Sequence, residues 1–244
     1  MDTATLSFGL IAFFLSAFLK GITGLGFSTI CLGILTIFID IKTAIPLVLI
    51  PSLSSNVLVM VSAQRFWDAV RRFHLIYITL IPGVVMGLWL LCRLDSTIAR
   101  TCLGGVLLLY GIWGLLNLHH RIAVRQERRL AVPVGYLNGV VNGVTGSQVM
   151  PLLPYLLALR LDKDVFVQTV NLSFTISSLI MIIGVSGMAY LNWPLAGASA
   201  FGIVPVAVGI WLVSKDRQVT PDTVFRRLVL GMLVVLGLAV VLNT

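Results

Sequence analysis

The chain has 244 residues, of which 58% are hydrophobic and only 11% are charged, and its formal net charge is +8. A soluble domain usually carries about a quarter charged residues, so this composition excludes a soluble globular domain. The basic side chains lie in short segments between apolar runs, which argues against nucleic-acid binding and is typical of cytoplasmic loops in membrane proteins.

The first apolar run, residues 6–38, is too long for one membrane span and too short for two. It is interrupted near its middle by "KGITGLG" (20–26), which contains a lysine, three glycines and a threonine. The arms on either side, of about 12 to 15 residues each, fall short of the hydrocarbon thickness. We therefore expect a broken or re-entrant pair of short helices whose tip lies inside the membrane.

Three apolar runs follow, each close to the roughly 20 residues that cross the hydrocarbon. They predict transmembrane helices at 43–63, 74–92 and 99–118. The basic segment at 119–130, "HHRIAVRQERRL", comes next, and we expect it to be a cytoplasmic linker.

The second half of the chain repeats this order. A long apolar run at 131–159 is interrupted by "GVTG" (143–146), which predicts a second broken pair. Three more apolar runs predict transmembrane helices at 165–187, 193–213 and 224–243.

The two halves also match residue by residue, because a shift of 122 residues superimposes the two breaks. The matched positions are Gly21 with Gly143, Thr23 with Thr145, Gly24 with Gly146, Asp40 with Asp162, Ser55 with Ser177 and Trp89 with Trp211. An ordered series of matches is typical of an internal duplication. We predict an all-α polytopic membrane protein with two repeats, 1–118 and 131–244, each a broken pair plus three transmembrane helices.

Each repeat crosses the membrane an odd number of times, so the second repeat should be inverted relative to the first. Basic residues concentrate at 64–72, in the linker and at 214–227. The positive-inside rule places these loops in the cytoplasm and both termini outside. The expected location is the cell (inner) membrane, with a multi-pass topology.

Inverted repeats with broken helices are a recurring transporter design, with the substrate near the midplane. Free N–H groups at an interrupted helix attract anions, and nearby hydroxyl and amide groups can donate hydrogen bonds. The predicted substrate-binding residues are Lys20, Gly21, Thr23, Gly24, Gly26, Ser55, Asn56, Asn138, Asn142, Gly143, Thr145, Gly146, Ser147, Gln148, Asn171 and Ser177.

A structural reading of the same residues stays open. The glycines could serve close helix packing, as in "GVVMG" (83–87), and the polar side chains could hydrogen-bond between helices. Lys20 could add positive charge to an anion site, or it could snorkel to the headgroups from a shallow tip.

Other chemistries find less support in the sequence. "GITGLG" lacks the strand and helix context of a nucleotide-binding loop, and the histidines, cysteines and carboxylates lack metal-ligand spacing. We predict no catalytic residues, no metal and no cofactor. A membrane-embedded enzyme or an accessory subunit is the alternative to a transporter. The coupling ion (proton or sodium) and the oligomeric state stay open.

The layout resembles that of the sulfite exporter TauE/SafE family, also called the 4-toluene sulfonate uptake permeases. The resemblance covers essentially the whole chain and rests most on "KGITGLGFSTICLGIL" and "NGVVNGVTGSQVMPLLPYLL". Pro151 matches a proline that is common after the glycines of that family. The resemblance implies a secondary transporter of a small sulfur-containing anion, either sulfite or an organosulfonate.

Overall fold

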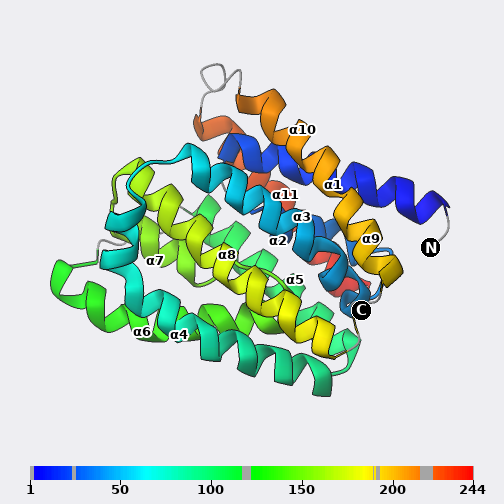
Figure 1. The fold of residues 1–244 in the computed structure, drawn as a ribbon, viewed down its shortest axis with the longest axis horizontal. Helices are drawn as coiled ribbons and strands as arrows, with labels where there is room; N and C mark the ends of the chain where they lie inside the picture. The colour runs from blue at the N-terminus through cyan, green and yellow to red at the C-terminus, as the bar shows by residue number, and fades with distance from the viewer. Residues whose placement is uncertain are drawn as a thin grey trace.

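The computed structural model describes residues 3–23, 26–116, 122–188, 190, 193–214 and 222–243. The regular structure in these ranges is α-helical (Figure 1). The first half contains α1 (Thr3–Thr23), α2 (Phe27–Leu35), α3 (Ile41–Ser62), α4 (Phe66–Arg93) and α5 (Ser96–Leu115). The second half contains α6 (Val124–Thr145), α7 (Leu152–Ala158), α8 (Lys163–Gly187), α9 (Trp193–Phe201), α10 (Ile203–Ser214) and α11 (Asp222–Leu242).

The lengths and apolar surfaces of these helices suit a lipid bilayer. Within the described residues, five stretches are long and apolar enough to cross a membrane, namely 41–61, 66–93, 96–115, 163–187 and 193–212. Large apolar side chains such as Ile78 and Val85 are more than half exposed on the outside of the bundle, which in water would be a liability. The prediction of an all-α polytopic membrane protein is therefore confirmed.

The predicted transmembrane run at 193–213 is two helices, α9 and α10, that meet at Gly202. Pro205 has no N–H to give to the carbonyl of Phe201, so the helical ladder is interrupted there. A Cβ atom at Gly202 would lie 2.7 Å from Cγ of Pro51 and 2.8 Å from the ring of Phe13. The break thus lets the chain approach α1 and α3 closely.

The prediction that each arm of a broken pair has about 12 to 15 residues is wrong. In each pair a long helix precedes a short one: α1 and α6 span 21 and 22 residues, whereas α2 and α7 span nine and seven. The long arm of the second pair gains length because residues 124–130, predicted as linker, form the first turns of α6. Arg72 of α4 stabilises these turns, since its guanidinium donates to both carboxylate oxygens of Glu127 at 2.7 and 2.8 Å.

The main helix pairs join one half of the chain to the other. α4 packs along α6, α10 packs along α1, and α5 packs along α11. The equivalent helices α3 and α8 lie side by side and run in opposite directions (Figure 1). The start of α1 and the end of α11 lie at one end of the bundle, and α3 leads into α4 at the other. The inversion of the repeats in a membrane, and the placement of both termini outside, stay predictions.

Equivalent positions of the two halves also share local roles. Asp40 and Asp162 are the N-caps of α3 and α8, and their carboxylates accept the N–H groups of Lys42 and Asp164 at 2.8 and 3.0 Å. Each cap fixes where the helix after a broken pair begins.

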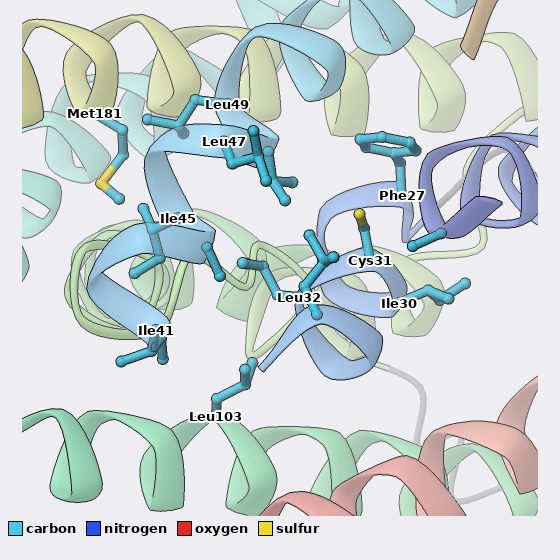
Figure 2. Close-up of a cluster of buried hydrophobic side chains, with 14 of the residues drawn as sticks. Phe27, Ile30, Cys31, Leu32, Ile41, Ile45, Leu47, Leu49, Leu103 and Met181 are labelled. Carbon is cyan, nitrogen blue, oxygen red and sulfur yellow. The ribbon is translucent and has the colours of Figure 1, made fainter. Parts of the chain in front are cut away.

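The short helix α2 lies inside the protein rather than against lipid. Every residue of α2 except Ile34 is buried. Figure 2 shows the apolar cluster around α2 and the first turns of α3, to which Leu103 of α5 and Met181 of α8 contribute. Because the cluster surrounds α2, a helix of only nine residues, too short to span a membrane, is accommodated inside the bundle.

Candidate functional site

The first break separates α1 from α2. α1 ends at Thr23, with Gly21 buried just before this end, and α2 begins after Gly26, whose φ of 87° is left-handed. This conformation favours glycine over any residue with a Cβ atom. Gly24, also predicted as a site residue, lies outside the described residues.

Lys20 sits three residues before the end of α1 and points into the protein. Its side chain is 1% exposed, so the snorkelling interpretation is wrong. Its amino group donates to Oγ of Ser55 at 3.0 Å and to Oδ1 of Asn56, both on α3. Ser55 in turn donates to the carbonyl of Ser52 at 2.7 Å. Three predicted site residues from two helices therefore meet in one buried network.

The second break is a left-handed turn at Gly146, where φ is 70°. The N–H of Gly146 donates to the carbonyl of Asn142 at 2.7 Å and closes the end of α6. The hydroxyl of Thr145 donates to the carbonyl of Val141 at 2.7 Å and accepts the N–H of Ser147 at 3.1 Å. The Thr145 side chain thus serves the backbone of the turn.

The two breaks touch each other. The hydroxyls of Thr29, in the first turn of α2, and Ser147, next to Gly146, lie 3.0 Å apart. A Cβ atom at Gly146 would lie 2.6 Å from Cδ1 of Leu32, so the turn lies directly against α2. Thr29 is not among the predicted site residues, although it lies in the first helical turn after the glycines.

Two amide side chains hold the irregular segment between α6 and α7. With the Asn138 amide oriented so that both of its ends are satisfied, its nitrogen donates to the carbonyls of Met150 and Gln148 at 2.9 and 3.1 Å. The amide nitrogen of Gln148 donates to Oγ of Ser178 on α8 at 3.0 Å. Ser178 was also missed, although it adjoins the predicted Ser177.

Several buried polar atoms around the breaks have no hydrogen-bond partner within the described part of the chain. In the first half these are Nδ2 of Asn56 and Oγ of Ser52. In the second half they include both amide atoms of Asn142, Oγ of Ser177, Oε1 of Gln148 and Oδ1 of Asn171. Buried polar groups are normally paired, so these atoms have hydrogen-bonding capacity available for a polar ligand.

A comparison with protein families agrees with this architecture. The family model described as "Sulfite exporter TauE/SafE" matches residues 9–240, which include both halves and both breaks. The chain belongs to the sulfite exporter TauE/SafE family. A search of curated proteins found no match, and a search of solved structures found none either.

TauE/SafE proteins are membrane transporters of the sulfite and sulfonate exporter type. This protein is accordingly a multi-pass membrane protein of a transporter family.

The two halves of this TauE/SafE protein differ at equivalent positions. Lys20 corresponds to Asn142, and Ser55 corresponds to Ser177. In the first half the lysine donates a hydrogen bond to the serine. The side chains of Asn142 and Ser177 have no hydrogen-bond partner within the described residues. At these equivalent positions the first half therefore has a basic side chain that contacts its serine, and the second half has an amide that does not.

Gly143, another predicted site residue, has a packing role in this structure. A Cβ atom on it would lie 2.6 Å from both Cα of Gly87 and the carbonyl oxygen of Val84 on α4. Asn171 directs its amide nitrogen to the carbonyl of Val167, 2.8 Å away in its own helix. The contacts of Gly143 show that α4 packs against this part of α6, and the Asn171 amide nitrogen is used within α8 itself.

Proposed function

We propose that this TauE/SafE protein is a secondary transporter of a small sulfur-containing anion, either sulfite or an organosulfonate, in the cell (inner) membrane. The observation that carries the proposal is Lys20, a fully buried lysine at the first break, beside a second break that is rich in unpaired polar groups. The proposed site lies between the two breaks and comprises the predicted site residues that surround them.

The donor chemistry around the breaks suits an oxyanion of sulfur. Such an anion spreads its charge over several oxygens, each of which accepts hydrogen bonds. Lys20, Asn56 and Asn142 supply ammonium and amide N–H groups, and Ser52 and Ser177 supply hydroxyls. In a site without water, hydrogen bonds to a charged group are about twice as strong as neutral ones.

Transport is favoured over the enzymatic alternative by where the ionisable residues lie. Asp40 and Asp162 cap helices at the ends of the bundle rather than facing the breaks. Within the described ranges, no three His, Cys, Asp or Glu side chains are placed to hold a metal ion. The hydrogen-bonding groups at the breaks therefore suit binding of an anion more than general acid or base chemistry.

We expect the purified protein alone, in liposomes, to carry sulfite and methanesulfonate across the bilayer. Counterflow of a labelled sulfonate into loaded vesicles measures this directly, with protein-free liposomes as the blank. The same anions should raise the melting temperature of the purified protein. Sodium salts of sugar acids, and neutral sugars, should raise it less. Stabilisation only by cations, or absence of flux from the purified protein, would favour the accessory-subunit alternative.

A further inference from the structure

Among the described helices that pack most against α1 or hydrogen-bond to Lys20, none contains a carboxylate side chain. α1 packs against α2 and α10, and Lys20 hydrogen-bonds to α3. The sequences of these four helices contain neither Asp nor Glu. Their other titratable side chains are Cys31, which is buried in α2, and Lys42, at the start of α3. A buried charge without a counterion is costly, so the empty site disfavours an ammonium.

The hydrogen bonds at Lys20 fit a neutral amine. A neutral amine has two N–H groups, and within the described residues the nitrogen has two acceptors, Ser55 and Asn56. Ser55 accepts here, because its own hydrogen goes to the carbonyl of Ser52. An ammonium would carry a third N–H, which a bound ligand could receive.

The spare groups beside this nitrogen can donate to such a ligand. Nδ2 of Asn56 is a pure donor, and it is unpaired in the described structure although Asn56 is only 1% exposed. The hydroxyl of Ser52, one helical turn earlier on α3, is equally buried and unpaired. An anion is the ligand that such donors and an ammonium would share.

We propose that Lys20 couples a proton to the transported anion. In the empty site the Lys20 amine is neutral, and the anion binds together with one proton taken from water. The nitrogen lone pair forms the new N–H bond, no bond of the anion breaks, and the third N–H donates to an anion oxygen. The charges of the ammonium and a monovalent anion cancel. This lowers the free-energy cost of moving the proton and the anion together through the membrane. This inference rests on the proposed function.

The duplication limits this coupling to one proton. Asn142, the equivalent of Lys20, has an amide side chain, which does not take up a proton near neutral pH. We therefore expect one proton for each anion.

Calorimetry of methanesulfonate binding tests this, because a sulfonate keeps its charge throughout the range in which sulfite titrates. Binding to the purified parent protein would be measured in two buffers with different heats of ionisation, which gives the protons taken up per anion. We expect about one proton at a pH where the empty amine is neutral. By reciprocity the Kd should then rise with pH, by up to about tenfold per pH unit.

Two variants assign the proton to its residue. Lys20→Arg keeps a permanent charge and Lys20→Gln has none, so neither should take up a proton on binding. His74→Gln is the control, because His74 is an exposed ionisable residue on α4, outside the proposed site. The number of protons that this variant takes up per anion should match that of the parent. If neither Lys20 variant folds, isotope-labelled lysine in the parent reports the same change, because amine and ammonium differ in NMR shift.

Several outcomes would overturn the inference. Sulfonate binding by the parent without proton uptake would remove the coupling and leave the proposed function standing. Full proton uptake in Lys20→Gln, or a Lys20 signal that does not change on binding, would move the proton elsewhere. Absence of binding of both methanesulfonate and sulfite would overturn the proposed function, and this inference with it.

Discussion

Replacing Lys20 with glutamine is expected to lower the affinity for sulfite or methanesulfonate by a factor of about ten or more. A hydrogen bond to a charged group contributes about 1.5 to 3 kcal/mol, and the site around Lys20 is fully buried. Glutamine is similar in length and can still donate to Ser55, so the variant removes mainly the charge. Binding isotherms for parent and variant measure the effect.

The matched control for this prediction is Lys42→Gln, which makes the same chemical change at the start of α3. Lys42 is only partly buried, and it lies at the end of the helix opposite to Ser55 and Asn56. Its variant should bind as the parent does. Equal affinities for the parent and a folded Lys20→Gln protein would show that this lysine does not face the anion.

The second large effect is expected from Gly87→Ala, at the crossing of α4 and α6. A Cβ atom at Gly87 would lie 2.4 Å from the carbonyl oxygen of Val140 and 2.7 Å from Cα of Gly143. Both contacts are backbone atoms, which cannot move aside as a flexible side chain can. Overpacking of this kind typically costs about 1 to 3 kcal/mol, so the melting temperature of the purified protein should fall by several degrees.

Gly105→Ala provides the matched control on α5. An added Cβ at Gly105 meets nothing within 4 Å, and alanine is the better helix former by about 1 kcal/mol. This variant should melt at or above the temperature of the parent. If the Gly87→Ala and Gly105→Ala proteins had the same melting temperature, the close approach of α4 and α6 at Gly87 would be contradicted.

The same crossing recurs in the other half, which extends the prediction to Gly209. This residue is equivalent to Gly87, and a Cβ on it would lie 3.0 Å from Cβ of Ala17 on α1. The shortest contacts are longer here than at Gly87, so Gly209→Ala should destabilise less. Glycine at both positions lets the two halves interlock at short distance.

The sequence by itself determined the helical membrane architecture, the family and the positions of both breaks. Helices in a bilayer satisfy their backbone internally, so apolar runs of sufficient length mark them without knowledge of their neighbours. Asp40 and Asp162 could be recognised as helix caps for the same reason, because a cap bonds to the backbone two residues away.

Only the tertiary structure decided which side chains face one another across the breaks. Lys20 points inward because Ser55 and Asn56, on another helix, supply its acceptors, and no local pattern around Lys20 contains that information. Thr29 and Ser147 meet because two halves that are distant in sequence interlock. Gly143 packs against Gly87 instead of lining an open turn, for the same reason. The apolar periodicity is a property of each helix alone, whereas these contacts depend on how helices from both halves cross.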